Sequence, residues 1–347
     1  MEEAATDLGM SFSELEAYLT NTVVGFDGLG CVTKFGTGQS NPTYKIAAQS
    51  GDYVLRSKPA GKLLPSAHAV EREYRVMQAL AQTDVPVPKM LHLATEEASP
   101  SGRVFFVMGF LTGNIYWDPA LPECDKTARS QIYDAMNDAL AAMHNIDPNS
   151  IGLTDFGKPG NYFSRQVERW SQQYLASVMT PDDSMLAIIT WLTDQMPADD
   201  GQVSLVHGDW RMDNMIFDAQ ENVIKGVLDW ELSTIGHPMA DLAYQCMQWR
   251  LPNTGDMRGL GGVDRSALGI PTEADFVASY ARRRGIAEIT NWPFYLVFAF
   301  FRLASILAGV AARAEAGNAS NPEMAWKYGA AVPVLAGLAQ EVMREGA

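Results

Sequence analysis

Cysteine is scarce in this chain of 347 residues, with only 3 in the whole sequence. Cys31, Cys124 and Cys246 lie far apart and form no CxxC spacing. Disulfide frameworks and structural zinc sites both need cysteines that are more numerous or more closely spaced. The sequence therefore argues against both, and a reducing compartment, the cytoplasm, is the expected location.

Positive charge is also scarce, because 26 Lys and Arg stand against 41 Asp and Glu and give a net charge of −15. Proteins that bind nucleic acid normally carry a basic domain or stripe, so we expect no nucleic-acid partner. The hydrophobic content of 47% with 19% charged residues is typical of a globular protein. The 5 histidines are scattered, which disfavours a histidine-rich metal centre.

Long apolar runs are almost absent, and the first residues show neither the basic nor the apolar segment of a signal peptide. The exception is 293–312, about 20 residues long, which is enough to cross a bilayer. Arg302 lies in its middle, and a central arginine costs about 2.5–3.5 kcal/mol on insertion scales. We therefore expect a buried helix here and no membrane partner.

The sequence pattern changes character near residue 112. Before that point, short β-rich runs alternate with turns and one amphipathic helix. The predicted strands are 32–36, 43–48, 52–56, 91–94 and 103–110, and the predicted helix is 67–82. The first third is thus predicted to be a five-stranded antiparallel sheet with one helix on it.

After that point the chain is predicted to be mostly helical. The predicted helices are 127–144, 162–179, 184–196, 273–284, 292–316 and 322–344. Short extended runs interrupt them at 203–229, with a turn over 218–222. We expect an α+β fold of two lobes, 1–112 and 113–347, with functional loops in the interruption.

The strongest chemical signal is Asp209 with Asn214 five residues later, followed by Asp229 after the predicted hairpin. Phosphoryl transfer from ATP needs an acid near the acceptor hydroxyl and oxygen ligands for Mg²⁺, and these residues supply both. A helix-capping Asp and a turn Asn would look the same locally. A metal-dependent hydrolase built on His207, Asp209 and Asp229 is a further reading, although it needs more ligands nearby.

The segment HGDWRMDN, followed by VLDWE and GHPMADLAY, resembles the aminoglycoside phosphotransferase-like family of small-molecule kinases, which also includes choline kinase-like proteins. Other segments are similar to one branch, the kinase domains fused to or encoded beside acyl-CoA dehydrogenases. The segments are FGTGQSNPTYKI, YVLRSKP, REYRVMQAL, TDVPVPKML and FAFFRLASILAGVAARAEAGNAS. The resemblance runs from about residue 24 to 345 and implies a protein-kinase-like fold that uses ATP and Mg²⁺.

The resemblance assigns roles to five residues around the central motif. Asp209 is implied to be the catalytic acid that positions the acceptor hydroxyl or takes its proton. Asn214 and Asp229 are implied to bind the metal. His207 and Asp241 are implied to support the loop structurally.

The resemblance also implies a nucleotide site in the first lobe. Gly38, Ser40 and Asn41 lie in a turn where kinases cover the phosphates with backbone N–H groups. Arg56 falls where kinases carry a lysine, with Lys58, two residues on, as the competing choice.

Two more elements complete the implied nucleotide site. Glu73 matches the helical acid that pairs with the phosphate-binding cation. Met108, Gly109 and Leu111 match the gatekeeper and hinge, where the backbone would bind adenine.

The acceptor site is predicted from the residues that follow Asp229, the implied metal ligand, and from residues late in the sequence, mainly arginines. The candidates are Trp230, Glu231, Trp249, Arg250, Arg302 and Arg313. Trp230 and Glu231 replace the Phe-Gly of the kinase Asp-Phe-Gly motif, which removes its glycine hinge. Arg302 must meet an anion or a carbonyl, or else form a buried ion pair.

Two classes of acceptor remain open. A cationic aminoglycoside or amino alcohol suits an acidic protein, whereas a hydroxyacyl-CoA or related hydroxy acid suits local arginines and apolar walls. The branch resemblance favours the second class and implies an acyl-CoA dehydrogenase as a pathway partner. A nucleotide-binding pseudokinase without turnover is the alternative of another class, and the oligomeric state is not indicated.

Overall fold

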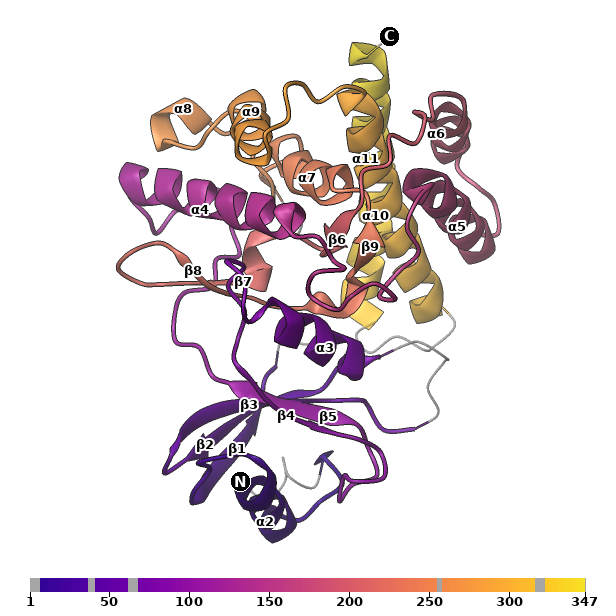
Figure 1. The fold of residues 1–347 in the computed structure, drawn as a ribbon. Helices are drawn as coiled ribbons and strands as arrows, with labels where there is room; N and C mark the ends of the chain where they lie inside the picture. Colours follow the sequence, from indigo (N-terminus) through magenta and orange to yellow (C-terminus); the bar gives the residue numbers. More distant parts are fainter. Residues whose placement is uncertain (1–6, 37–40, 62–67, 255–257, 316–321, 347) are drawn as a thin grey trace. The chain divides into compact units, whose positions relative to one another are not determined.

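The computed structural model describes residues 7–36, 41–61, 68–254, 258–315 and 322–346 (Figure 1). The chain forms two compact units, each made of two stretches of sequence. The sheet unit comprises Met1–Asn114 and Met215–Leu232, and the helical unit comprises Ile115–Asn214 and Ser233–Ala347.

The sheet unit contains the five-stranded antiparallel sheet that the sequence predicts, with strand order β1-β2-β3-β5-β4. Its strands are β1 (Leu29–Lys34), β2 (Thr43–Ala48), β3 (Gly51–Ser57), β4 (Met90–Ala94) and β5 (Phe105–Gly109). Alternation sets the register, since Tyr44 and Ile46 on β2 are buried and their neighbours are only partly buried. The buried side chains face helix α2 (Phe12–Thr22), which contributes Leu15 and Leu19 to the same core.

Helix α3 (Val70–Leu80) buries one face made of Val70, Val76, Met77 and Leu80. Glu73 belongs to the same face and is only 1% exposed. A carboxylate among apolar side chains must be paired or hydrogen-bonded, so this residue marks a position where the helix serves more than packing.

The hairpin of β7 (Met215–Phe217) and β8 (Ile224–Val227) packs with the sheet unit. The predicted boundary at residue 112 puts it in the other lobe. The Val227 N–H donates to the Pro86 carbonyl at 2.9 Å. A Cβ on Gly226 would lie 2.4 Å from the Leu111 side chain, so a larger residue at this position would require the leucine to shift.

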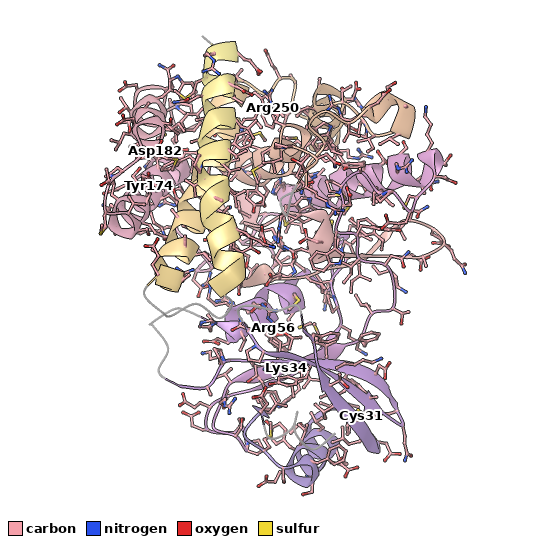
Figure 2. The ribbon with its side chains drawn as sticks, turned by 180° about the vertical axis from the view of Figure 1, so that it is seen from behind. Cys31, Lys34, Arg56, Tyr174, Asp182 and Arg250 are labelled. Carbon is pink, nitrogen blue, oxygen red and sulfur yellow. The ribbon has the colours of Figure 1, made fainter. Side chains whose placement is uncertain are left out.

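The helical unit contains eight helices among its described residues. They are α4 (Lys126–Asn145), α5 (Tyr162–Ser177), α6 (Asp183–Asp194), α7 (Met239–Cys246), α8 (Arg265–Leu268), α9 (Glu273–Arg284), α10 (Trp292–Glu315) and α11 (Pro322–Glu345). Strands β6 (Ser204–Val206) and β9 (Thr234–Gly236) pair antiparallel within this unit. The Asp182 carboxylate caps the start of α6, and the Tyr174 hydroxyl accepts its backbone N–H at 2.9 Å (Figure 2).

Helix α10 is the apolar segment that is long enough to span a membrane. Within its most apolar window, 78% is buried inside the protein. It packs against α5, α7 and α11, which is the arrangement of a core helix.

Candidate active site

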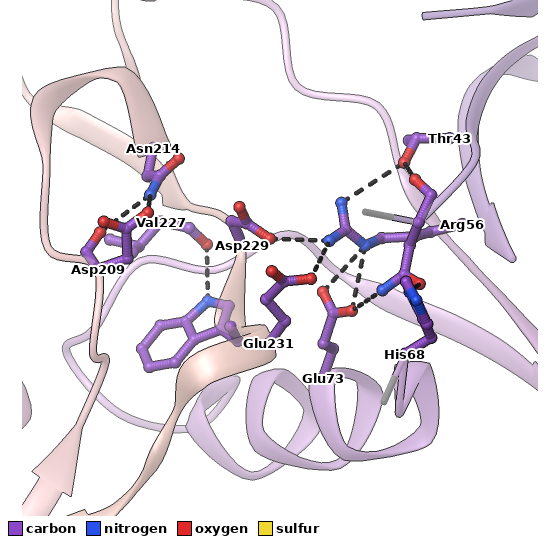
Figure 3. Close-up of polar contacts among 11 residues, drawn as sticks. Thr43, Arg56, His68, Glu73, Asp209, Asn214, Val227, Asp229 and Glu231 are labelled. Atoms are coloured by element: carbon purple, nitrogen blue, oxygen red, sulfur yellow. Dashed lines mark hydrogen bonds and ion pairs between the residues drawn. The ribbon is translucent and has the colours of Figure 1, made fainter. Parts of the chain in front are cut away.

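The loop between β6 and β7 carries Asp209, whose carboxylate is held by three side chains of the helical unit. The Tyr244 hydroxyl donates to Oδ1 at 2.7 Å, and the Arg211 Nε lies 3.1 Å from the same oxygen. The Asn214 amide nitrogen donates to Oδ2 at 3.0 Å and to the Asp209 carbonyl at 2.9 Å (Figure 3). The side chain remains 18% exposed, so a ligand can reach it.

Burial raises the pKa of the Asp209 carboxyl, but Arg211, the Tyr244 hydroxyl, His207 and Arg302 together outweigh burial and leave the pKa below its ordinary value. The group is therefore ionised at neutral pH. An ionised carboxylate of low basicity orients a hydroxyl by accepting its hydrogen bond.

Asn214 is the last residue of the short 3₁₀ turn Met212–Asn214. Its hydrogen bonds determine which way its side-chain amide faces. Only the nitrogen of an amide can donate to the two Asp209 oxygens, so Nδ2 is committed to them. The oxygen Oδ1 points away from Asp209 and forms no hydrogen bond to a described residue (Figure 3). It is the atom that a hard cation would bind.

Asp241 on α7 contacts the backbone of the loop that carries Asp209 and is 1% exposed. Its Oδ2 accepts the His207 backbone N–H at 2.7 Å, and its Oδ1 accepts the Gly208 N–H at 2.8 Å. The His144 ring contributes a longer contact at 3.4 Å. The His207 ring in turn accepts the Asp209 backbone N–H at 3.2 Å, so both residues hold the loop backbone in place.

The sheet unit gathers a second charged cluster around Arg56 on β3. Its Nε lies 3.0 Å from Glu73 Oε2, and its Nη2 lies 2.8 Å from Asp229 Oδ1 and 3.6 Å from Glu231 Oε2 (Figure 3). Lys58, the competing cation, pairs instead with Glu71 at 2.8 Å. Arg56 is thus the cation that meets both the helical acid and the acid after the hairpin.

Asp229 adopts a left-handed backbone with φ of 63° directly after β8. Such a conformation is uncommon outside glycine and tends to persist at functional sites. One carboxylate oxygen of Asp229 pairs with Arg56, and Oδ2 forms no hydrogen bond or ion pair to a residue that the structure describes. Within the sheet unit, that oxygen is an atom suited to a hard cation.

Burial raises the pKa of Glu73 to about 7, although Arg56 acts in the opposite direction. The fold therefore prefers a protonated Glu73 relative to the unfolded chain, where its pKa is near 4.5. The associated stability is present below the unfolded value and is lost as the pH rises through the folded value.

We expect Glu73→Gln to remove a pH dependence of folding stability. In the wild type, this residue should lower the free energy of unfolding by roughly 1–3 kcal/mol between about pH 4.5 and 7. Denaturant titrations at several pH values would measure it. Glu71→Gln, on the same helix but paired with Lys58 and 43% exposed, is the matched control and should keep the wild-type slope. Equal slopes for all three proteins would contradict the expectation.

Most remaining nucleotide-side candidates have structural partners. Gly38 and Ser40 lie outside the described residues. The Asn41 amide donates to Glu73 at 3.0 Å and its oxygen contacts the His68 ring at 2.9 Å, so this side chain is committed to the Arg56 cluster.

The proposed hinge residues lie at the end of β5. The Gly109 N–H donates to the Lys89 carbonyl at 2.9 Å. Met108 is 8% exposed, and Leu111 packs against Gly226 of the hairpin.

Three of the residues predicted for the acceptor site make contacts within the protein that explain their positions. Trp230 is 0% exposed and its indole donates to the Val227 carbonyl at 2.9 Å. Trp249 is 4% exposed and donates to the Pro271 carbonyl at 2.8 Å. Arg250 pairs with Glu273 at 2.9 Å and with Glu345 at 2.6 Å (Figure 2 labels it).

The two late arginines on α10 have different environments. Arg313 is exposed in the last turn. Arg302 is 8% exposed, and its guanidinium lies over the rings of Trp170 and Tyr244, at 5.6 and 5.4 Å from the centroids. The buried ion pair that we considered for Arg302 does not form with any described residue.

Tyr244 and Arg211 are partners of Asp209 that sequence reasoning missed. Tyr244 lies three residues after Asp241, and a helix puts such positions on one face. That spacing was the available signal, because a tyrosine beside a loop-bracing acid can reach the same loop.

The residues present fit a magnesium ion better than a metal ion whose ligands all come from protein side chains. Among the described residues, no group of three or more His, Cys, Asp or Glu side chains is placed to hold a metal. Mg²⁺ usually takes one or two protein oxygens and completes its shell with water and phosphate oxygens. In the helical unit, Asn214 Oδ1 is an oxygen of this kind, and in the sheet unit Asp229 Oδ2 is another. Neither has a hydrogen bond to the described part of the chain.

Curated relatives of this chain belong to acyl-CoA dehydrogenase proteins. The chain is 45% identical over 289 residues to acyl-CoA dehydrogenase family member 10 of Mus musculus, which covers 83% of this chain and 27% of that protein. It is 43% identical over 314 residues to the protein named probable acyl-CoA dehydrogenase IBR3 of Arabidopsis thaliana, covering 86% and 38%. The chain thus spans well under half the length of these relatives.

Solved structures show the same fold. A crystal structure from Ralstonia eutropha, described as a candidate aminoglycoside phosphotransferase, matches with a TM-score of 0.86 and 44% identity, covering 96% of this chain and 98% of that one. The aminoglycoside phosphotransferase APH(4)-Ia, in a ternary complex with AMP-PNP and hygromycin B, matches with a TM-score of 0.60 and 16% identity, covering 96% and 99%. The second likeness is one of fold alone.

A family model described as "Phosphotransferase enzyme family" matches residues 32–286, well over half of the chain. The match contains the Asp209 loop, the Arg56 cluster and the bracing Asp241. Together with the curated relatives, it confirms the resemblance that the motifs indicate: the chain belongs to the phosphotransferase enzyme family, in the branch that includes acyl-CoA dehydrogenase-linked kinase domains.

Proposed function

We propose that this protein transfers the γ-phosphate of ATP, with Mg²⁺, to a hydroxyl group of a small molecule in the cytoplasm. The observation that carries the proposal is the state of Asp209. It is ionised, reachable, and held at both oxygens by Tyr244, Arg211 and Asn214. A carboxylate fixed in this way suits an acceptor hydroxyl.

In the proposed reaction, Asp209 accepts a hydrogen bond from the acceptor hydroxyl and orients it towards the γ-phosphorus of ATP. As the new P–O bond forms, the bond between the γ-phosphorus and the oxygen bridging to the β-phosphate breaks, ADP leaves, and the hydroxyl proton passes to Asp209. Mg²⁺ would neutralise charge on the phosphates, with Asn214 and Asp229 as its protein ligands. Arg56 would hold phosphate oxygens, because a guanidinium offers several donors in a fixed plane. Its salt bridge to Glu73 orients it for this role.

For the acceptor, we propose a hydroxyacyl-CoA or a related hydroxy acid. The curated relatives are named as acyl-CoA dehydrogenases, and this chain matches less than half of each. A phosphorylated hydroxyl is a better leaving group than a free one, which fits a kinase acting beside a dehydrogenase on acyl substrates. An aminoglycoside acceptor is the second candidate, favoured by the name of the 44% identical structure.

An ATP-consumption screen tests both candidates. Purified protein would be offered ATP and Mg²⁺ with hydroxyacyl-CoAs, free hydroxy acids, amino alcohols and aminoglycosides, and products would be identified by mass increase. Transfer to an acyl acceptor is the expected result. ATP binding without transfer to any hydroxyl compound would instead support a nucleotide-binding module, and metal-dependent hydrolysis without ATP would support a hydrolase.

A further inference from the structure

Arg302 is a buried cation that forms no ion pair with the part of the chain that the structure describes. It lies in the middle of α10, is 8% exposed, and makes no hydrogen bond or ion pair with any residue that the structure describes. A buried charge normally has a partner, because removing it from water is costly. The two aromatic rings offset part of that cost, and the five N–H donors of the guanidinium have no acceptor among the described residues.

The position of Arg302 links it to the catalytic loop. The face of the Tyr244 ring lies 5.4 Å from its guanidinium carbon, and the hydroxyl of the same tyrosine donates to Asp209 at 2.7 Å. Arg302 also contributes to the lowered pKa of Asp209. The Tyr244 side chain therefore contacts both the Arg302 guanidinium and the acid of the loop.

The guanidinium is also open to a ligand. Arg302 is 8% exposed, so its side chain is not fully sealed from solvent. Trp170 and Tyr244 hold the planar group from two helices, α5 and α7, which fixes its orientation before any ligand arrives. A preorganised guanidinium is suited to an oxygen pair such as a carboxylate.

We propose that Arg302 is the specificity-determining residue for the acceptor and binds its acyl oxygen while Asp209 engages the hydroxyl. The inference rests on the proposed function and adds a requirement to it. The acceptor must carry a carboxylate or thioester oxygen as well as the reacting hydroxyl. The two groups must be far enough apart to reach Arg302 and Asp209, which lie on either side of the Tyr244 side chain. A polycationic acceptor is disfavoured, because Arg302 would repel it.

Arg302→Met tests this by removing the charge while keeping an unbranched apolar side chain. Steady-state kinetics would compare a hydroxy acid, its CoA thioester and a diol of equal chain length that lacks the acyl oxygen. We expect kcat/KM for the acid and thioester to fall by about 10- to 100-fold, mainly through KM, and that for the diol to change little. A larger loss for the acid identifies the carboxylate as the ligand, and a larger loss for the thioester identifies the carbonyl.

Arg169→Met is the matched control. Its guanidinium lies over the same Trp170 ring at 5.2 Å but is exposed, and it should retain wild-type kinetics. Thermal melting adds a readout that separates binding from structure. Arg302→Met should melt at or above the wild-type temperature, since it removes an unpaired buried charge. A lower melting temperature with equal losses for all three acceptors would show a structural role and overturn the proposal.

The proposal and the proposed function can fail separately. If the wild type transfers phosphate only to neutral or cationic acceptors and Arg302→Met does the same, the role of Arg302 is lost while the phosphotransferase stands. If the wild type transfers phosphate to nothing, calorimetric titration with the hydroxy acid decides. Binding to the wild type and not to Arg302→Met upholds the anion site, and equal or absent binding overturns it.

Discussion

Replacing Asp209 with asparagine is expected to lower kcat for phosphate transfer by about 10²- to 10⁴-fold while ATP binding remains. The substitution removes the negative charge that accepts the hydroxyl proton. It also places an amide where Asn214 Nδ2 now donates at 3.0 Å to a carboxylate oxygen. Two donors would then face each other, or the new amide would turn its nitrogen towards Tyr244 and Arg211, which also donate.

Asp118→Asn is the matched control for this variant. Asp118 belongs to the helical unit, pairs with Arg258 at 3.0 Å and has a side chain 17% exposed, against 18% for Asp209. The same chemical change at equal exposure should leave turnover unchanged. Wild-type transfer by Asp209→Asn would remove this residue from the reaction.

Asp241→Asn is expected to have the largest effect on stability. The carboxylate accepts two backbone N–H groups, from His207 and Gly208, and contacts His144, all in the protein interior. An amide has one oxygen, so one donor would face its NH₂ group and stay unsatisfied. We expect the free energy of unfolding to fall by about 2–3 kcal/mol in denaturant titrations.

The acid-side behaviour should follow from the same contacts. Burial raises the pKa of Asp241, but the His144 and Gly208 hydrogen bonds outweigh it and the net pKa is lowered. Its stabilisation is therefore present above the unfolded pKa and lost as the pH falls through the folded value. Asp200→Asn, which loses a partly exposed contact to His237 at 3.1 Å, should cost under about 1 kcal/mol. Equal stabilities for the two variants would show that Asp241 does not brace the loop.

Local sequence signals were sufficient for much of the fold. Alternation located β2 and β3, and the helical period located α4 and α9 to within a residue or two. Helix α2 was missed, although Ser11 and Glu14 form a capping box that its sequence displays. Strand β9 was missed because three residues carry too little pattern to recognise.

In the candidate site too, contacts between residues close in sequence could be predicted, and contacts between distant residues could not. The five-residue spacing of Asp209 and Asn214 is local, and the sequence shows it directly. The contact of Tyr244 with Asp209 crosses 35 residues, and that of Arg56 with Asp229 crosses 173. Spacing puts Tyr244 on the same helix face as Asp241, but it does not show which distant residue the tyrosine contacts. For the same reason, the sequence does not show that Arg302 lacks an ion pair with the described residues.

The divided sequence of the sheet unit has a consequence for synthesis of the chain. Arg56 and Glu73 emerge early, whereas Asp229 follows 173 residues after Arg56. At translation rates of 5–20 residues per second, that interval lasts roughly 10–35 s. A nascent chain meanwhile holds a guanidinium that lacks its second acid and a Leu111 not yet covered by Gly226. The sheet unit can therefore be completed only after the Asp209 loop has been made, so a chain interrupted before residue 215 lacks the contact of Arg56 with Asp229.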